Sequence, residues 1–146
     1  MASRRELILE NLKTACEDIQ VANGYNWDVK LVTRRLLLPF SFHPKDIPGI
    51  CIVDRTESAL YRGQREIRIL GVELLAVCDG GEAQISTRLN SLIEDVLTAI
   101  GKDPTRGGNA IDTQLESVTS YQLPKTPLGF AEFNLTITYP ELNLNR

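Results

Sequence analysis

The chain has 146 residues, of which 42% are hydrophobic and 24% charged, and its formal net charge is −3. This composition excludes global disorder, and the length suits one domain, residues 1–146, with a single core. The acidic balance argues against a general nucleic-acid binder, which needs a basic excess. There is no run of ~18 uncharged apolar residues, so no membrane span is expected. Glu6 and Glu10 interrupt the start of the chain, where a signal peptide needs an apolar stretch, so we expect a cytoplasmic protein.

The first predicted element is a helix over residues 3–22, in which apolar residues recur at helical spacing. Ser3 is placed to cap its N-terminus, and Glu6, three residues later, completes the pattern of a capping box. Asn23-Gly24 predicts the end of the helix, because both residues tolerate the left-handed conformation.

The next stretch reads as strands separated by loops. Residues 27–38 are rich in Val, Leu and Thr and predict a strand that Pro39 ends. The segment 40–48 is bracketed by prolines and predicts a loop that carries two aromatic residues. Residues 49–54 form a short apolar run typical of a buried strand, and the polar segment 55–64 predicts a loop or hairpin connection.

A long strand is predicted over residues 65–78, with Gly71 marking a bend or bulge. Asp79-Gly80-Gly81 ends that strand and starts a second helix. Its apolar residues from Ile85 to Ile100 repeat at spacings of three and four, and Gly101 ends it.

The C-terminal part predicts a turn-rich loop over 102–111, a weakly alternating strand over 112–123 and a clearer strand over 131–139. In this last strand, apolar side chains alternate with polar ones, which indicates one buried and one wet face, and Pro140 is expected to end it. The sequence therefore predicts an α+β fold: a mostly antiparallel sheet of about four to five strands with two helices packed on one face.

Few residues are suited to catalysis or metal binding. Cys16, Cys51 and Cys78 are widely spaced among apolar neighbours and predict buried, reduced thiols. His43 is the single histidine and lies in the proline-bracketed loop, so a catalytic triad or a zinc site is not expected. Glu94-Asp95 are adjacent on a helix and predict solvated charges. We therefore expect no enzyme, no metal and no cofactor.

Surface contacts remain as the expected mode of action. Three segments predict them, namely 40–48, 55–64 and 102–111, because long loops often carry binding functions. The candidate contact residues in these segments are Phe40, Phe42, His43, Arg62, Arg65 and Arg106.

The order of elements and several local patterns resemble the tail terminator (tail completion) proteins of long-tailed bacteriophages. The resemblance is carried, in chain order, by Arg5-Glu6-Leu7-Ile8-Leu9-Glu10-Asn11-Leu12, Asn23-Gly24-Tyr25, Val32-Thr33-Arg34-Arg35, Pro48-Gly49-Ile50-Cys51-Ile52-Val53-Asp54, Arg68-Ile69-Leu70-Gly71-Val72-Glu73, the helix from Leu89 to Ile100, and Ile137-Thr138-Tyr139.

This resemblance implies a ring, expected to be a hexamer, that caps the tail tube and stops its polymerisation. Its expected partners are copies of itself, the tail tube protein and the neck or connector protein of the head. Genome DNA is expected to pass through the ring without specific binding. The expected location is the tail–neck junction of a virion assembled in the bacterial cytoplasm.

Three other interpretations stay open. The chain is also compatible with a different neck or head-completion protein of a phage. A small cellular regulatory or ligand-binding domain could use the cleft between helices and sheet as a pocket. An enzyme subunit with a site between chains would offer Glu73, Asp79 and His43 as candidates.

Overall fold

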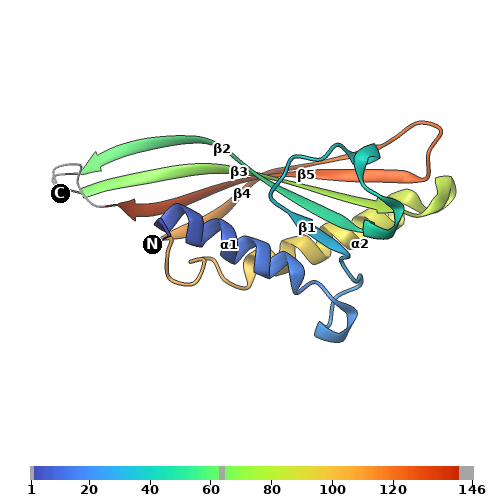
Figure 1. The fold of residues 1–146 in the computed structure, drawn as a ribbon, viewed down its shortest axis with the longest axis horizontal. Coiled ribbons are helices and arrows are strands. Elements are labelled where there is room, and N and C mark those ends of the chain that lie inside the picture. The colour runs from blue at the N-terminus through green and yellow to red at the C-terminus, as the bar shows by residue number, and fades with distance from the viewer. Residues whose placement is uncertain (1, 63–64, 142–146) are drawn as a thin grey trace.

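The computed structural model describes residues 2–62 and 65–141, shown as a ribbon in Figure 1. The two helices are α1 (Arg4–Glu17) and α2 (Gly81–Gly101). The strands are β1 (Leu31–Thr33), β2 (Gly49–Arg62), β3 (Arg65–Asp79), β4 (Asp112–Gln122) and β5 (Leu128–Glu141). Short 3-10 turns lie at Val21–Asn23, Pro39–Ser41 and Pro44–Asp46.

The strands form one sheet in the order β1-β2-β3-β5-β4. Every neighbouring pair is antiparallel except β1 and β2, which run parallel. Both helices lie on the same side of the sheet (Figure 1). The predicted fold class, an α+β fold with two helices packed against a mostly antiparallel sheet, is confirmed.

The main core lies between this helical layer and the sheet. In β5 the predicted alternation is confirmed, because every second side chain from Ala131 to Tyr139 is buried. In α2 the buried face carries Ile85, Leu89, Leu92 and Val96, as its helical spacing predicted. The three cysteines are buried and free, which confirms their predicted state.

Helix α1 begins as predicted but ends earlier. The hydroxyl of Ser3 accepts a hydrogen bond from the Glu6 amide at 3.1 Å, as an N-cap does. The helix ends at Glu17 instead of residue 22 because the chain turns back, and the Val29 amide donates to the Ile19 carbonyl at 3.0 Å. Ile19 is buried outside the helix, so its apolar character extended the prediction too far.

Strand β1 has three residues, where the sequence predicted a strand over 27–38. The Asp95 carboxylate of α2 accepts hydrogen bonds from the amides of Asn26 (3.0 Å) and Trp27 (2.9 Å), so this part of the chain is held on the helix. Asp95 is 3% exposed. The prediction of a solvated charge is therefore wrong for Asp95, although Glu94 is exposed.

Strand β2 is longer than predicted, because it continues to Arg62 through most of the segment 55–64 that was expected as a loop. The pairing of β2 with β3 shifts through a β-bulge that lies opposite Gly71, where the sequence predicted a bend. Beyond the bulge the sheet projects past the start of α1 (Figure 1). Polar residues suit a strand there, because no helix covers it.

Strand β5 continues through Pro140, which was predicted to end it. Pro140 lies opposite Ile67 of β3, while the pairing of β5 with β4 begins only at Thr138. The amide of Ile111 donates to the Thr138 carbonyl, so Thr138 and, by alternation, Pro140 turn their backbone groups toward the β4 side. A proline is tolerated there because β4 does not extend far enough to pair with Pro140.

Candidate interaction surfaces

The projecting end of the sheet is the first candidate surface (Figure 1). Leu60 and Tyr61 are exposed near the end of β2 and point to opposite faces, as neighbours in a strand do. The backbones of Arg62 and Arg65 pair where β2 and β3 meet. The side chains of these two predicted contact residues lie outside the described part of the structure.

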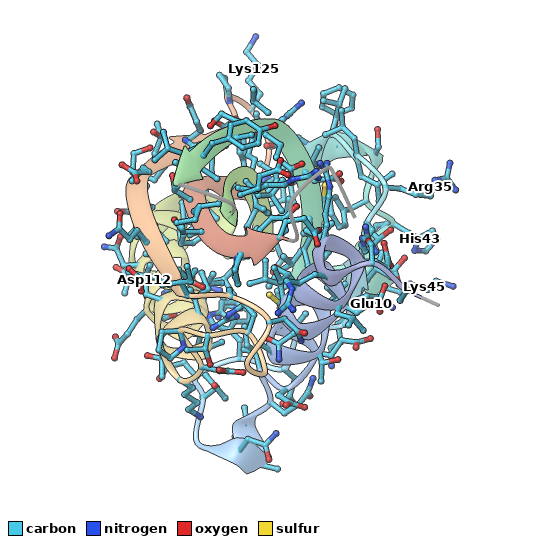
Figure 2. The ribbon with its side chains drawn as sticks, turned by 90° about the vertical axis from the view of Figure 1, so that its left-hand side faces the viewer. Glu10, Arg35, His43, Lys45, Asp112 and Lys125 are labelled. Atoms are coloured by element: carbon cyan, nitrogen blue, oxygen red, sulfur yellow. The ribbon has the colours of Figure 1, made fainter. Side chains whose placement is uncertain are left out.

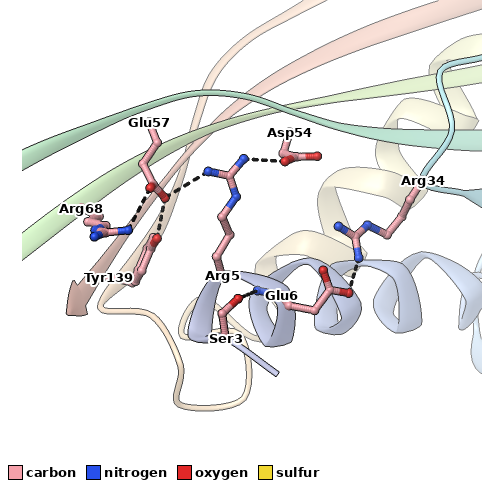
Figure 3. A network of polar contacts seen from close by, with 8 residues as sticks. All are labelled: Ser3, Arg5, Glu6, Arg34, Asp54, Glu57, Arg68 and Tyr139. Carbon is pink, nitrogen blue, oxygen red and sulfur yellow. Dashed lines mark hydrogen bonds and ion pairs between the residues drawn. The ribbon is translucent and has the colours of Figure 1, made fainter. Parts of the chain in front are cut away.

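A network of polar side chains fastens the base of this projecting end to α1 (Figure 3). Arg5, in the first turn of α1, donates a hydrogen bond to Asp54 and lies 3.5 Å from the Glu57 carboxylate. Glu57 also accepts hydrogen bonds from Arg68, at 3.3 Å, and from the Tyr139 hydroxyl. A single carboxylate therefore links α1, β2, β3 and β5.

These contacts shift the pKa of several groups in the network. The hydrogen bond from Arg5 lowers the pKa of the Asp54 carboxyl, and the same bond raises the pKa of Arg5. Burial raises the pKa of Tyr139 to about 12, and its hydrogen bond to Glu57 acts in the same direction. Tyr139 is therefore protonated at neutral pH and can serve as the donor.

Arg34 makes a second link to α1. Its Nη1 lies 2.5 Å from the Glu6 carboxylate and 3.0 Å from that of Glu10, and the hydrogen bond lowers the pKa of Glu6. The acid of the predicted capping box thus pairs with Arg34, while Ser3 makes the capping bond. This link fixes the start of the segment 34–48.

The segment 34–48 is the second candidate surface, and it lies on the face of the sheet away from the helices (Figure 1). Phe42 is 5% exposed and joins a small second core with Cys51, Leu75 and Val77. The sequence predicted this face of the sheet as wet and Phe42 as a contact residue. The structure instead makes Phe42 the residue that seats the segment on the sheet.

Phe40 points the other way and is 71% exposed, which leaves it available as the predicted contact. Leu36 and Leu38 of the same segment are exposed as well. These two leucines are not among the predicted contact residues, because the sequence predicts a strand over residues 27–38. The three exposed side chains, Leu36, Leu38 and Phe40, are called the apolar loop surface below.

Charge differs between the two sides of the molecule. His43 is exposed, and its Nδ1 accepts a hydrogen bond from the Lys45 amide at 3.2 Å. Figure 2 shows Arg35, His43 and Lys45 on one side, with Asp112, at the start of β4, on the opposite side. Strand β4 contains acidic residues and no Lys or Arg. The cations Arg35 and Lys45 thus lie on the side away from β4, together with Glu10, whereas β4 itself carries acidic residues alone among its charged ones.

The loop 102–111 is held against the helices instead of extending into solvent. Arg106 is fully buried, and its guanidinium donates a hydrogen bond to the Ile100 carbonyl. Burial lowers the pKa of Arg106. Asp103 accepts hydrogen bonds from the Gly107 amide at 2.7 Å and from Asn11 of α1 at 3.2 Å. Arg106, predicted as a contact, therefore has no surface to offer.

A pocket of about 530 Å³ lies between the C-terminal parts of α1 and α2. The Lys102 amino group lies 4.4 Å from the centre of the Tyr25 ring at this pocket, a cation–π geometry. Its polar lining also includes Asn11, Thr14, Asp18, Asn23 and Asp103.

The described residues contain no group of three or more His, Cys, Asp or Glu side chains suited to a metal ion. Among the same residues, no helix is long and apolar enough to cross a membrane. Of the three candidates for a site between chains, Glu73 pairs with Arg55 at 3.0 Å, Asp79 is exposed, and His43 lies in the segment 34–48. The structure does not bring these three side chains into one cluster.

No protein-family model matches the sequence, and no curated protein matches it. Among the solved structures that match, "Virion of native gene transfer agent (GTA) particle" contains a chain that aligns with 92% of this chain and 92% of its own length. The sequence identity is 6% and the TM-score 0.42, which is below the level that defines a common fold.

Proposed function

We propose that this chain is a structural virion assembly protein of the tailed-phage type and, within that class, a tail terminator. Copies of the chain close into a ring, expected to be a hexamer, on the end of the tail tube. The ring stops tube polymerisation at the tail–neck junction and joins the tail to the neck or connector protein.

The observation that carries this proposal is the difference between opposite sides of the molecule. The side near the apolar loop surface bears Arg35 and Lys45, while the β4 side bears Asp112 (Figure 2). A ring needs one patch on each copy to meet a different patch on its neighbour. Two sides that differ in charge satisfy that requirement, whereas a two-fold dimer formed through the β4 side would place acidic side chains together.

The projecting end of the sheet suits a contact along the tail axis. It extends past the helices with Leu60 and Tyr61 exposed, and the network around Glu57 holds its base. A firmly held projection loses less conformational entropy on binding than a mobile loop does. We assign the two faces of this projection, on which Leu60 and Tyr61 lie, to the tail tube protein or the neck protein, and this contact does not use the backbone edge of β2.

The first test is native mass over a wide concentration range, followed by electron microscopy of purified tail tubes incubated with the protein. A discrete hexamer, and caps on tube ends that stop further growth, are the expected results. A protein that stays monomeric and leaves tube growth unchanged would refute the proposal. Binding to filled heads without tube capping would favour the other neck or head-completion protein.

Single variants test the apolar loop surface. Phe40→Ser is expected to block ring formation and to leave the free energy of unfolding unchanged, because Phe40 is exposed. Val21→Ser is the matched control, since Val21 is also exposed but lies in the turn after α1. Normal rings from Phe40→Ser would remove this surface from the interface. Charge reversal at Arg62 and Arg65 tests the projecting end in the same way.

The pocket between α1 and α2 favours a second candidate, a small ligand-binding or regulatory domain. A ligand that binds the folded state raises the melting temperature in a saturable way. A screen of small metabolites by thermal shift tests this reading. A saturable shift that Lys102→Ala abolishes, together with a monomeric native mass, would favour the ligand-binding domain over the ring.

A further inference from the structure

Strand β4 leaves one long edge of the sheet open. It is the last strand in the order and pairs with β5 alone among the described residues. Native edges are usually blunted by Lys, by Pro or by short length. Strand β4 has 11 residues, contains neither Lys nor Pro, and carries no charge from Ser117 to Gln122. Its acidic residues, Asp112 and Glu116, and its bulge near Leu115 lie in the first half of the strand, and the second half shows none of these features.

The opposite edge of the sheet is open as well. Strand β2 has 14 residues and β1 pairs with the first three, Gly49–Cys51, which leaves 11 from Ile52 to Arg62. In the described part of the chain, no backbone hydrogen bond joins this stretch to anything but β3. The two free edges therefore have equal length.

The directions of the strands make these two edges complementary. Strands β2, β3, β5 and β4 follow one another in the sheet with alternating sense, so β4 runs antiparallel to β2. In a closed ring, neighbouring copies are related by a rotation of less than half a turn. Corresponding strands of two neighbours therefore point in roughly similar directions. The β2 edge of a neighbour would then meet β4 as an antiparallel strand, which continues the existing pattern.

We propose that the chain assembles with itself by strand addition: β4 of one copy pairs with the free part of β2 in the next copy. The sheet then runs without interruption from subunit to subunit, and the backbone hydrogen bonds supply the contact. This inference rests on the proposed ring and names the surface that closes it.

Charge favours this pairing over the pairing of two β4 edges. On β4, Leu115 and Tyr121 are exposed and can pack against the neighbouring strand in either pairing. Two β4 strands side by side would bring acidic side chains together. The free part of β2 instead contains Arg55 and Arg62 besides Asp54 and Glu57, so it has no net acidic charge.

A proline in β4 tests the backbone contact. The Leu123 amide donates to the Leu128 carbonyl at 3.1 Å, so it points into the sheet, and alternation turns the Ser120 amide outward. Ser120→Pro removes this outward donor without breaking a bond to β5. Ser120→Ala is the matched control, because it keeps the amide. We expect Ser120→Pro to remain monomeric at concentrations where Ser120→Ala forms the ring. The circular dichroism spectra of the two variants should agree, because both keep the fold.

Crosslinking identifies which edges meet. Thr119 of β4 and Ser58 of β2 are exposed and lie on the same face of the sheet, opposite the helices, while the native cysteines are buried. Thr119→Cys and Ser58→Cys variants of different mass are mixed and treated with a short bis-maleimide. The expected product is a mixed dimer of the two variants, with little dimer from either variant alone.

The outcomes separate this inference from the proposed function. Rings that form with Ser120→Pro, or rings that give no mixed crosslink, would overturn strand addition and leave the ring intact. Dimers of Thr119→Cys alone would show pairing of two β4 edges. That result would overturn both strand addition between β4 and β2 and the proposed ring. The absence of any self-association, on tube ends as well as in solution, would also overturn both strand addition and the proposed ring.

Discussion

Glu57 accepts hydrogen bonds from Arg68 and Tyr139 and faces Arg5, so its contacts cross from one helix to three strands. Asp95 acts in a similar way, since its carboxylate caps the amides of Asn26 and Trp27. Both residues look like ordinary surface acids in the sequence. Their role comes from partners that are distant along the chain, and buried acceptors of this kind are costly to remove.

Glu57→Ala tests the network. The Tyr139 hydroxyl would lose its acceptor while remaining buried, so the free energy of unfolding should fall by about 1–3 kcal/mol. Glu10→Ala is the control, because the Glu10 side chain is 51% exposed and that of Glu57 only 17%. Its pair with Arg34 should contribute less than about 1 kcal/mol. Equal losses in urea unfolding of both variants would contradict a special role for Glu57.

The raised pKa of Tyr139 predicts a loss of stability in alkali. Its ordinary pKa of 10.0 applies to the unfolded chain, and the folded value is about 12. Between these two values the folded state binds more protons than the unfolded state, so the free energy of unfolding falls as pH rises. Denaturant titrations from neutral to alkaline pH measure this loss. Tyr139→Phe should lack this component, and an unchanged alkaline profile would contradict the assignment.

At the scale of elements, close backbone approaches decide where segments can lie. A Cβ on Gly49 would stand 2.5 Å from the Phe42 ring and 2.6 Å from the Asp46 carbonyl, so glycine allows the segment 34–48 to pack on the start of β2. The apolar loop surface depends on this packing, because Phe42 seats the segment from which Phe40 projects.

Gly49→Ala should therefore displace the segment and lower the free energy of unfolding by about 1–3 kcal/mol. Gly101→Ala is the control: a Cβ there meets nothing within 4 Å, and alanine favours a helix over glycine. That variant should be as stable as the native chain or up to about 1 kcal/mol more stable. Thermal unfolding compares the two, and a tolerated Gly49→Ala would contradict the close packing.

At the scale of the whole molecule, attraction between the acidic residues of β4 and the cations Arg35 and Lys45, which lie on the other side, favours head-to-tail contact between copies (Figure 2). Added salt should weaken this association, because it screens attraction between exposed charges beyond about 10 Å at 0.1 M ionic strength. Native mass at rising salt measures the effect. A ring whose formation is independent of salt would show that apolar and backbone contacts alone hold it.

Charge reversal at single positions tests whether the β4 side, and not the net charge of the chain, governs association between copies. Glu116→Lys, on the exposed part of β4, should weaken association strongly at low salt. Glu94→Lys makes the same charge change on the exposed face of α2 and should leave association near the native level. Equal effects of the two variants would indicate that net charge, and not the β4 side, governs assembly.

The sequence by itself determined the fold class, the order of helices and strands, and the buried faces of α2 and β5, because these follow from periodic apolar residues and local caps. It also predicted the bend at Gly71 and the exposed Phe40. It failed where polar residues form strands without a covering helix, as in β2 beyond the bulge, and where one apolar residue lies past a helix end, as Ile19 does.

Only the tertiary structure decided which polar residues are buried and which edges of the sheet are open. Phe42 and Arg106 are buried because Phe42 packs with Leu75 and Arg106 donates a hydrogen bond to the Ile100 carbonyl. No local pattern in the sequence predicts these contacts. The open edges of β4 and β2 follow from strand order, which depends on how distant segments pair. Local interactions fix the elements, whereas the surfaces available to a partner are set by contacts between residues far apart in the chain.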